Sequence, residues 1–596
     1  MSNNKALDLI CMGRVAVDLY GQQVGSRLED MGSFAKYLGG SSGNVAFGAA
    51  RQGLKSSMLA RVGNEHMGRF VREKLQRVGV DTSHLITDPE RLTALVILGI
   101  KDTDTFPLIF YRENCADMAI QAEGRVLDID YRPVLWGLTN PGDGETRYIE
   151  SDPVTKQLQD VLHHFDLIVG TEEEFHIAGG STDTLEALRT VRAVSDAVLV
   201  CKRGALGCSV FEKDIPASLD DGLTIYGVEV KVLNVLGAGD AFMSGLMRGY
   251  LNDEGWEQSC RYANACGALV VSRHGCAPAM PSKEELDDYL SRAESVPRPD
   301  LDPRLNHLHR VTTRDRHWGE LNIMAFDHRS QLVNLARETG APKTCIAMLK
   351  QLILKAAEQV AEETPPKDHV GVFVDSSFGK DVLDAVTGRG WWVARPIEQP
   401  GSRPLRLEHG NIGSQLIDWP LEHIVKCLVF YHPEDSTEMR TNQEQQLKEI
   451  YRACCKSGHE LLLEVVLPPD MPKSDELYLH TLKRLYSLNI KPDWWKLPPL
   501  ASHSWDRVSE LLEESDPHCH GVVILGLEAP MDQLQEGFNA AAGKDAVKGF
   551  AVGRTIFMEP SREWMLNRIN DDEFIRRIKE NYRQLIALWN NRKSYA

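Results

Sequence analysis

Apolar and polar residues follow a strand-like pattern through the first half of the chain. Short apolar, often β-branched runs are bounded by glycine, asparagine, aspartate or proline, which is typical of buried strands between turns. The runs that we interpret as strands are Leu7–Val17, Thr93–Ile100, Pro107–Arg112, the run that begins at Val126, and Ala197–Lys202. Thr93–Ile100 and Pro107–Arg112 have the pattern of paired strands, so we expect them to pair with each other.

The second half of the chain repeats one pattern eight times. Short apolar runs alternate with stretches in which apolar residues recur at helical spacing. The apolar runs are Leu321–Phe326, Val370–Val374, Trp391–Ala394, Val425–Tyr431, Leu461–Leu467, Asp493–Leu497, Val522–Leu527 and Gly549–Val552. Eight strand–helix repeats are typical of a (β/α)8 (TIM) barrel, whose active site lies at the carboxyl ends of the strands.

The two patterns meet at a proline-rich, charged stretch, Ser295–Arg304. Such a composition is typical of a linker between domains. A chain of 596 residues is also longer than one hydrophobic core usually organises. We therefore expect a first domain over residues 1–294, a linker over residues 295–310 and a second domain over residues 311–596.

Composition narrows the classes of function. The formal net charge of −18 argues against a nucleic-acid-binding protein, because phosphate contacts need clustered lysine and arginine. No apolar run approaches the length of roughly 20 residues that a membrane-spanning helix needs. The twelve cysteines are scattered without a C-x-x-C pair, which fits a reducing compartment. We expect a soluble, cytoplasmic protein that contacts neither nucleic acid nor membrane.

One turn in the first half carries candidate chemistry. An apolar approach from Tyr226 to Val235 ends in Gly237-Ala238-Gly239-Asp240, where a helix begins. Glycines let the backbone approach a ligand, and a helix N-terminus attracts an anion. A carboxylate at that position suits the general base of a phosphoryl transfer. The alternative is an ordinary turn that is followed by an acidic residue in the first helical turn.

This turn resembles the C-terminal signature of the ribokinase-like (PfkB) carbohydrate kinases. Gly39, Gly40 and Asn44 match the sugar-contacting signature of the same family, and the two signatures occur in the family's order. The resemblance implies an open α/β sheet sandwich with a small β lid. The variant Asn-Val-Leu-Gly-Ala-Gly-Asp is similar to the branch that phosphorylates 5-dehydro-2-deoxygluconate, a sugar acid of myo-inositol breakdown.

The resemblance also implies roles for individual residues. Asp240 would be the catalytic base, ATP and Mg²⁺ the cofactors, and a homo-oligomer the assembly; a monovalent cation is left open as a further cofactor. The substrate-binding residues would be Asp18, Gly39, Gly40, Asn44 and Arg112. The nucleotide-binding residues would be Lys202, Gly204, Gly207, Gly237, Ala238 and Gly239, with Glu174 acting indirectly on Mg²⁺.

The first half departs from the family in one place. Between the strand that ends near Glu113 and the strand at Val126 lie only about a dozen residues, which barely suffice for a parallel crossover with its helix. Relatives carry a further strand and helix there. Either the chain lacks one βα unit of the central sheet, or the proline- and glycine-rich stretch Gly137–Val154 belongs to a rearranged region.

Charged residues occur where barrel chemistry is expected. They are Asp327, Asp375, Lys426, Glu464, Lys496 and Arg554. Lys496 lies among apolar residues, and desolvation lowers the pKa of a lysine toward that of a nucleophilic, Schiff-base-forming amine. The alternative is a lysine that extends its amine to solvent at the end of the barrel.

These strand ends resemble, in order, those of the class I aldolases of the tagatose-bisphosphate type. The resemblance implies that Lys496 forms the Schiff base, that Glu464 and Lys426 manage protons, that Asp327 orients substrate, and that Arg554 holds phosphate, without any cofactor in this half. His328 stands where that family has glutamine, which leaves the substrate of the barrel open. The histidine triad of a zinc-dependent class II aldolase is absent from the sequence.

The two halves together suggest consecutive reactions. A kinase would make the 6-phosphate of 5-dehydro-2-deoxygluconate, and an aldolase would split it into dihydroxyacetone phosphate and malonate semialdehyde. One alternative is a kinase for another keto-sugar acid, with a barrel that binds a phosphosugar without cleaving it. Another is a non-catalytic sensor of sugar phosphates.

Overall fold

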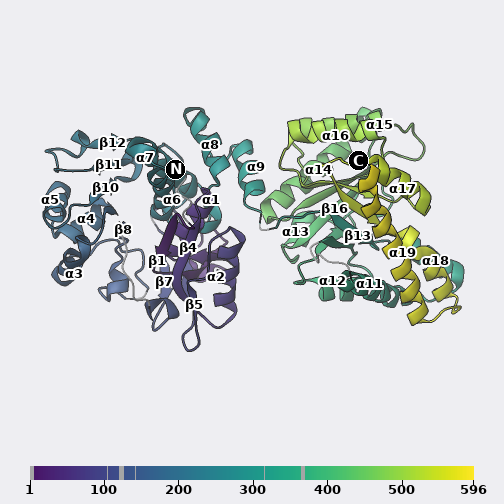
Figure 1. Ribbon diagram of the computed structural model, residues 1–596, viewed down its shortest axis with the longest axis horizontal. Coiled ribbons are helices and arrows are strands. Elements are labelled where there is room, and N and C mark those ends of the chain that lie inside the picture. The colour runs from purple at the N-terminus through teal and green to yellow at the C-terminus, as the bar shows by residue number, and fades with distance from the viewer. Residues whose placement is uncertain are drawn as a thin grey trace. The chain divides into compact units, whose positions relative to one another are not determined.

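The protein was analysed as a computed structural model that describes residues 6–103, 105–119, 126–140, 142–314, 316–363 and 369–595. Its internal contacts divide the chain into two compact units, Met1–Arg316 and His317–Ala596 (Figure 1). Each unit has its own hydrophobic core. In the described part, no helix is both long enough and apolar enough to cross a membrane.

The N-terminal unit contains three sheets. A parallel sheet has the order β1 (Leu9–Met12), β4 (Ser56–Gly63), β5 (Leu85–Asp88). A five-stranded sheet has the order β12 (Leu223–Ile225), β11 (Cys208–Phe211), β10 (Val198–Lys202), β9 (Leu167–Thr171), β8 (Val126–Asp128). A small sheet has the order β3 (Phe34–Gly39), β2 (Ala16–Gly21), β6 (Ala94–Leu98), β7 (Leu108–Tyr111). We call this small sheet the lid.

The lid confirms one expected pairing and changes the first strand. β6 and β7 pair antiparallel, as their sequence pattern predicts. The run Leu7–Val17, expected as one strand, instead supplies β1 to the parallel sheet and the start of β2 to the lid. Gly13 separates the two with a φ of +129°, a conformation that favours glycine. The approach from Tyr226 to Val235 is irregular, because β12 already ends at Ile225.

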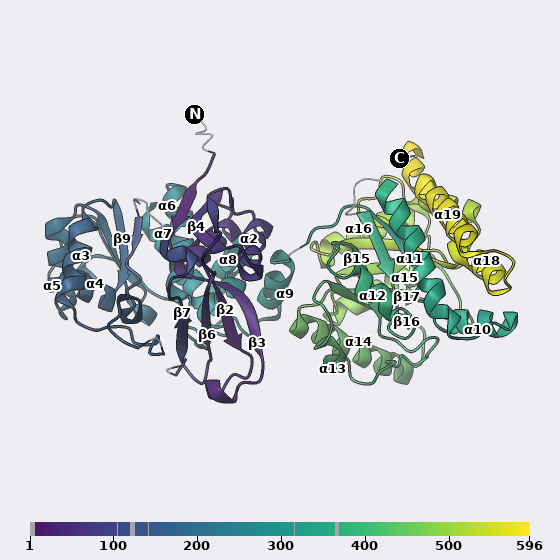
Figure 2. The same ribbon diagram turned by 90° about the horizontal axis from the view of Figure 1, so that it is seen from below.

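Helices cover these sheets and complete the core. They are α1 (Ser41–Arg51), α2 (His66–Arg77), α3 (Asp152–Leu162), α4 (Glu172–Gly179), α5 (Thr184–Val194), α6 (Ala238–Leu251), α7 (Gly255–Val271), α8 (Lys283–Arg292) and α9 (Pro303–Thr312). Figure 2 shows α3, α4 and α5 grouped beside β9. One core cluster contains Met58 from β4, Val200 from β10 and Leu246 from α6, so α6 helps to hold the two larger sheets together.

The two larger sheets do not pair with each other in the described part of the chain. β1 and β8 each lie at the edge of their sheet. Between β7 and β8, the described residues form only the 3-10 helix η2 (Ala116–Ala119). Ile10 of β1 is 53% exposed, although the first strand of such a sheet is usually buried on both faces. This arrangement agrees with the interpretation that the chain lacks one βα unit.

The C-terminal unit is a closed barrel of eight parallel strands, as predicted. The strands are β13 (Leu321–Ala325), β14 (Val370–Phe373), β15 (Trp392–Pro396), β16 (His423–Phe430), β17 (Leu461–Val466), β18 (Trp494–Leu497), β19 (Gly521–Leu525) and β20 (Val547–Val552). Pairing of β13 with β20 closes the ring. Trp392 and Trp494 meet edge to face inside it at 5.7 Å, which fills the interior.

Ten helices of the described residues surround the barrel. They are α10 (Ser330–Thr339), α11 (Cys345–Glu363), α12 (Lys380–Val386), α13 (Ile412–Leu416), α14 (Thr437–Ser457), α15 (Asp475–Ser487), α16 (Ser502–Ser515), α17 (Met531–Ala540), α18 (Arg554–Met565) and α19 (Asp571–Asn591). Their apolar faces pack on the outward side chains of the strands, and together these form the larger core of the unit.

The stretch expected as a linker, residues 295–310, forms most of α9 and packs on the N-terminal unit. Asp302 caps the helix by accepting a hydrogen bond from the backbone N–H of Leu305 at 2.8 Å. Leu305, Leu308 and Val311 recur at helical spacing and are buried. Because of this apolar stripe, the boundary between the units falls at Arg316, later than the expected one.

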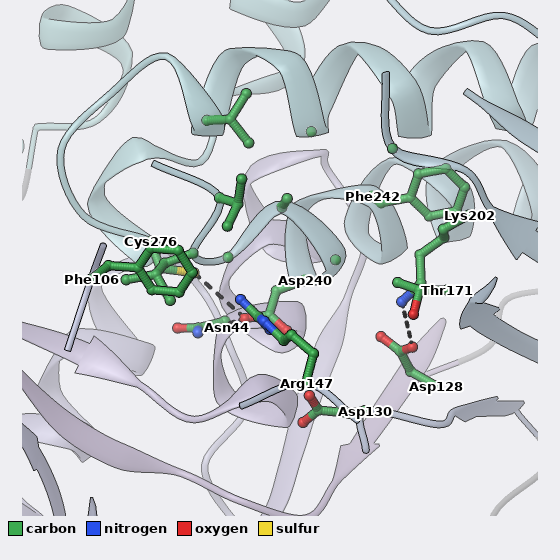
Figure 3. A pocket seen from close by; sticks show the side chains of 18 of the residues that line it. Asn44, Phe106, Asp128, Asp130, Arg147, Thr171, Lys202, Asp240, Phe242 and Cys276 are labelled. Carbon is green, nitrogen blue, oxygen red and sulfur yellow. Dashed lines mark hydrogen bonds and ion pairs between the residues drawn. The ribbon is translucent and has the colours of Figure 1, made fainter. Parts of the chain in front are cut away.

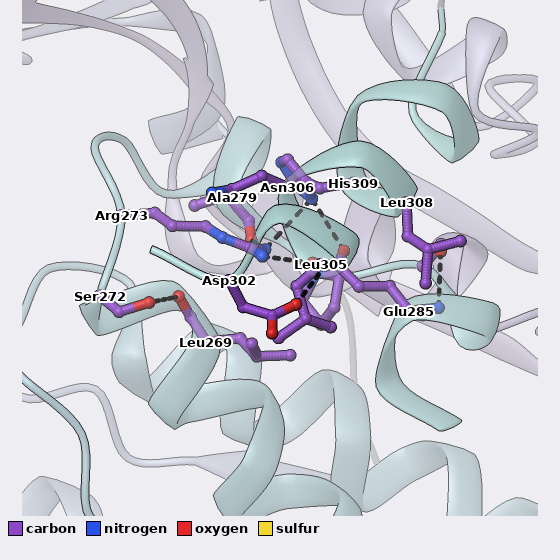
Figure 4. A network of polar contacts seen from close by, with 12 residues as sticks. Leu269, Ser272, Arg273, Ala279, Glu285, Asp302, Leu305, Asn306, Leu308 and His309 are labelled. Carbon is purple, nitrogen blue, oxygen red and sulfur yellow. Dashed lines mark hydrogen bonds and ion pairs between the residues drawn. The ribbon is translucent and has the colours of Figure 1, made fainter. Parts of the chain in front are cut away.

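A buried polar network also ties α9 to the N-terminal unit (Figure 4). His309 Nδ1 lies 2.8 Å from Glu285 Oε2, and Glu285 also pairs with Arg273. Arg273 follows α7, and Glu285 is on α8, so three helices meet in this network. Arg273 and His309 lower the pKa of Glu285 to about 2, although its burial alone would raise it.

Candidate active sites

A cavity of about 570 Å³ lies in the N-terminal unit between the lid, the N-termini of α1 and α6, and the ends of β8, β9 and β10. Figure 3 shows Asp240 at its centre, with Lys202 and Asp128 to one side. The cavity brings together nearly all of the residues that the sequence indicated for this unit. They are Asp18, Gly40, Asn44, Glu174, Lys202, Gly204, Gly207, Gly237, Ala238, Gly239 and Asp240.

Asp240 lies in the first turn of α6, as expected. Its carboxylate accepts hydrogen bonds from Ser41 Oγ at 2.7 Å and from Asn44 Nδ2 at 2.8 Å. Burial, followed by the charge of Asp130, raises the pKa of Asp240. A buried carboxylate with a raised pKa is a stronger proton acceptor than an exposed one, which suits a general base.

Glycine is required where the backbone turns into α6. Gly237 precedes the helix with a φ of +78°, and a Cβ there would lie 2.2 Å from Cys276 Sγ. Cys276 itself donates to Asp240 Oδ2 at 3.5 Å. The turn therefore brings the start of α6, with its positive dipole end, and the Asp240 carboxylate to the same cavity.

The lid side of the cavity carries Asp18 from β2 and the Gly39-Gly40 turn. A Cβ on Gly39 would lie 1.9 Å from Asp18 Oδ1, so only glycine lets the two strands approach this closely. Burial raises the pKa of Asp18 to about 7, although the charge of Arg14 opposes the shift. Asn44 Oδ1 is buried without a hydrogen-bond partner in the described part of the chain, so it is available to a donor such as a substrate hydroxyl.

The opposite side carries a chain of alternating charges at the ends of β8, β9 and β10. Lys202 Nζ lies 2.8 Å from Asp128 Oδ1 and 3.3 Å from Glu174 Oε2. Glu174 also closes a capping box with Thr171 at the start of α4. Burial raises the pKa of Asp128 to about 7 despite the nearby Lys202.

These residues fit a nucleotide with its magnesium ion. Lys202 and the N-terminus of α6 offer positive charge to phosphates, and Asp128 and Glu174 are oxygen donors. In the described part of the chain, no group of three or more metal-ligating side chains is placed to hold a metal by itself. Magnesium would therefore share its ligands with phosphate oxygens and water, which is its usual mode of binding.

Arg112 differs from the expectation. It does not line the cavity, and its Nε donates to Asp117 Oδ2 at 2.9 Å because both belong to the segment that follows β7. Residues that were not selected from the sequence also line the cavity, among them Arg14, Arg147 and Cys276. Arg147 and Cys276 lie apart from the matched motifs in sequence, so only the fold could indicate them.

In the C-terminal unit, the charged residues expected at the strand ends form one buried cluster. Glu464 on β17 lies between two lysines: Lys426 Nζ is 2.9 Å from its Oε2, and Lys496 Nζ is 3.2 Å from its Oε1. Asp327 Oδ2 is 3.4 Å from Lys426 Nζ. All four side chains are nearly inaccessible to solvent, so the sequence correctly indicated residues that meet in space.

The two lysines have different electrostatics. Burial lowers the pKa of Lys496, and Glu464 offsets the shift only in part. The Lys496 ammonium also lies 4.4 Å from the centre of the Phe373 ring, an apolar contact that limits its hydration. For Lys426, burial is outweighed by Glu398, Glu464 and Asp327, which raise its pKa well above the ordinary value.

One member of the cluster, Glu398, was missed at the sequence level. Glu398 Oε1, just after β15, accepts from Lys426 Nζ at 3.0 Å and from Arg329 Nη2 at 3.2 Å. Asp375 has a different role from the other strand-end residues, because it forms a fully buried ion pair with Lys350. It therefore supports the barrel wall rather than facing a ligand.

Arg554 begins α18 and is partly exposed, with Nη1 donating to Glu528 Oε2 at 2.5 Å. A Cβ on the preceding Gly553 would lie 1.8 Å from Ala325 O, so this turn requires glycine. His328 lies close to the same turn and is held neutral, because burial lowers its pKa to about 4.

Comparison with protein families identifies both units. A family model described as an uncharacterized protein conserved in bacteria (DUF2090) matches residues 285–593, which is more than half of the chain. The chain belongs to this family. The model of the pfkB family carbohydrate kinases matches residues 6–128 and 145–283. The N-terminal unit is thus a pfkB carbohydrate kinase domain, hereafter the kinase unit, and the C-terminal unit is the barrel.

Curated relatives match the kinase unit over nearly their whole length. The 5-dehydro-2-deoxygluconokinase of Halalkalibacterium halodurans is 28% identical over 341 residues, covering 50% of this chain and 98% of the relative. That of Geobacillus kaustophilus is 27% identical over 336 residues, covering 48% and 95%. Among solved structures, a putative ribokinase II from E. coli in complex with ATP and Mg²⁺ is 18% identical, covers 48% and 99%, and has a TM-score of 0.39.

The first alignment also bears on the interrupted sheet. It spans 341 residues but takes up only 50% of a 596-residue chain. The relative therefore has residues without a counterpart in this chain.

Proposed function

We propose that this protein is a bifunctional enzyme that phosphorylates 5-dehydro-2-deoxygluconate at its 6-hydroxyl and then cleaves the product. The observation that supports the first step best is the Asp240 carboxylate, buried at the N-terminus of α6 in the cavity of a pfkB kinase domain. The proposed sugar follows the relatives, which are named 5-dehydro-2-deoxygluconokinases. The arginines that line the cavity suit an anionic substrate.

In the kinase step, Asp240 accepts the proton of the substrate hydroxyl. The freed oxygen forms a bond to the γ-phosphorus of ATP, and the bond from that phosphorus to the bridging oxygen breaks, which releases ADP. Backbone N–H groups at the start of α6 face the group in transit. Lys202 neutralises phosphate charge. Bound Mg²⁺ would neutralise further phosphate charge. The carboxylates of Glu174 and Asp128, which both lie beside Lys202, would help to hold it.

In the barrel, the cluster supports a Schiff-base retro-aldol reaction. The Lys496 amine, with its lowered pKa, condenses with the C5 ketone and releases water. A base takes the proton of the C3 hydroxyl, the C3–C4 bond breaks, and its electrons enter the imine. Glu464 lies 3.2 Å from Lys496 Nζ and is placed to move this proton. Protonation at C4 and hydrolysis then give dihydroxyacetone phosphate, and the other product is malonate semialdehyde.

Mass spectrometry of the products tests both steps together. The purified protein is mixed with Mg-ATP and 5-dehydro-2-deoxygluconate. Dihydroxyacetone phosphate is expected from the wild type, the 6-phosphate alone from Lys496→Met, and neither from Asp240→Asn. Borohydride should trap substrate on Lys496 in the wild type. An unchanged substrate would refute the kinase step, and a stable 6-phosphate with the wild type would refute the cleavage.

One observation favours a second candidate function. The interrupted sheet next to the cavity is a reason to consider a kinase unit that binds sugar and nucleotide without turnover, so that the protein acts as a sensor. This function requires ligand binding that survives Asp240→Asn while no ADP is released by the wild type.

The twelve thiols, all free of disulfides, fit a reducing compartment, and we place either function in the cytoplasm.

A further inference from the structure

Three arginines line the kinase cavity, and they differ in their partners. Arg14 lies 3.5 Å from Asp130 Oδ2, and Arg132 lies 3.3 Å from Asp130 Oδ1. Arg147 has neither a hydrogen bond nor an ion pair to any residue that the structure describes. Its one specific contact is with the ring of Phe106, 5.6 Å away. A guanidinium inside a cavity without a counterion is suited to an anionic ligand.

The backbone around Arg147 is held firmly. Gly144 N donates to Leu108 O of the lid at 3.2 Å, and a Cβ on Gly144 would lie 2.7 Å from the Phe110 ring. On the other side, Tyr131 Oη donates to Ile149 O at 2.7 Å. The segment is thus attached to the lid before Arg147 and to the end of β8 after it. Figure 3 shows its side chain in the cavity.

The charges near Arg147 indicate which part of a bound ligand it meets. Burial and Arg132 lower its pKa to about 10, while Glu174, Asp130 and Glu173 oppose the shift. The guanidinium is therefore charged at neutral pH. Glu173 and Glu174 begin α4 on the side of the cavity that also carries Lys202, whereas Phe106, which the guanidinium contacts, packs in the core of the lid. Figure 3 shows Arg147 among the side chains that line the cavity together with Asp130 and Asp240.

We propose that Arg147 is a catalytic residue that donates hydrogen bonds to the phosphoryl group during its transfer. It makes no covalent bond; it offsets the negative charge on the phosphoryl oxygens while the acceptor oxygen–phosphorus bond forms and the bond to the ADP oxygen breaks. The inference rests on the kinase activity but not on the identity of the sugar acid. The competing role is that Arg147 binds the carboxylate of the sugar acid, and the experiments below distinguish the two roles.

Steady-state kinetics of Arg147→Ala and Arg147→Lys test the proposal. We expect Arg147→Ala to lower kcat about a hundredfold, with little change in the KM of the sugar acid. Arg147→Lys should retain more activity because it keeps the charge. Arg27→Ala is the control, since Arg27 is an exposed arginine that pairs with Asp30 at 2.7 Å. An intact kcat with a raised KM for the sugar acid would assign Arg147 to the carboxylate and overturn the proposal.

A binding measurement separates this proposal from the choice of sugar. MgADP with aluminium fluoride imitates the phosphoryl group in transit, and its affinity is measured by calorimetry without any sugar turnover. We expect Arg147→Ala to weaken this complex at least tenfold while the affinity for MgADP alone is unchanged. Equal affinity of wild type and variant for the fluoride complex would refute the proposal. A wild type that binds this complex tightly but phosphorylates no sugar acid would refute only the proposed function.

Discussion

Two lysines meet one glutamate in the barrel, and their surroundings drive their pKa values apart. Glu398, Glu464 and Asp327 raise the pKa of Lys426 against its burial. Burial and the charge of Lys426 lower the pKa of Lys496, although Glu464 and Asp327 oppose the shift. Groups whose environments separate their pKa values in this way take different roles in catalysis. The neutral amine suits Lys496 as the nucleophile, and the permanent charge suits Lys426 as an electrostatic partner of the substrate.

The lowered pKa of Lys496 makes the pH dependence of imine trapping a prediction. An amine attacks a ketone only when it is neutral, so trapping should begin at a lower pH than for an ordinary lysine. Glu464 favours the ammonium form, so Glu464→Gln should move the midpoint lower still. The measurement is the yield of cyanoborohydride-trapped adduct on Lys496 against pH, by mass spectrometry. A midpoint that rises in Glu464→Gln would contradict this account.

Asp18 makes a second prediction at the residue scale. Its pKa of about 7 in the folded kinase unit exceeds that of an unfolded aspartate, about 3.9. Its contribution to stability is therefore present below pH 4 and is lost as the pH rises through 7. Asp18→Asn cannot ionise, so it should stabilise the unit at pH 8 by up to about 4 kcal/mol, with the gain vanishing near pH 4.

Hydrogen exchange of peptides from β2 and β3 would measure that gain in the kinase unit alone. Peptides from the barrel strands serve as the internal control, since they belong to the other unit. Slower exchange in Asp18→Asn at pH 4 as well as at pH 8 would show that the effect is unrelated to ionisation.

At the scale of elements, α9 decides where the kinase unit ends. This helix begins in a proline-rich stretch, and its buried residue Leu305 packs in the core of the kinase unit. Leu305→Ala should destabilise the kinase unit by about 2–5 kcal/mol, the usual cost of emptying a buried leucine site. Calorimetry should show the kinase transition shifted and the barrel transition unchanged. Leu301→Ala is the matched control, because Leu301 is 63% exposed. A shifted barrel transition would place α9 in the other unit.

Regular elements could be predicted because their pattern is local. All eight barrel strands and the glycine-rich turns follow from periodicity and turn residues, and Asp240, Lys496 and Glu464 lie at the ends that this pattern gives. Glu398 and Arg147 could not be predicted, since each enters its site from an irregular segment whose path depends on distant contacts. The expected linker range overlaps α9. Proline is common both in linkers and in the first turn of a helix, so the proline-rich sequence alone could not distinguish the two.

At the scale of the whole molecule, the proposed function assigns one reaction to each unit. Asp240→Asn should lower phosphorylation by about 10²- to 10⁴-fold and leave cleavage of added 6-phosphate unchanged. Lys496→Met should abolish cleavage and leave ADP release unchanged. Coupled assays of ADP and of dihydroxyacetone phosphate measure the two activities separately. Loss of both activities in either variant would mean that the units depend on each other.

The interrupted sheet of the kinase unit has a consequence for aggregation at high protein concentration. β1 and β8 are both short edge strands, and the side chain of Ile10 on β1 is exposed to solvent. Unpaired strand edges with apolar side chains are templates for the same edge of another molecule. Aggregation should therefore start from the kinase unit and not from the barrel, whose ring has no edge. A single charge at this edge, Ile10→Lys, should raise the concentration at which light scattering first appears.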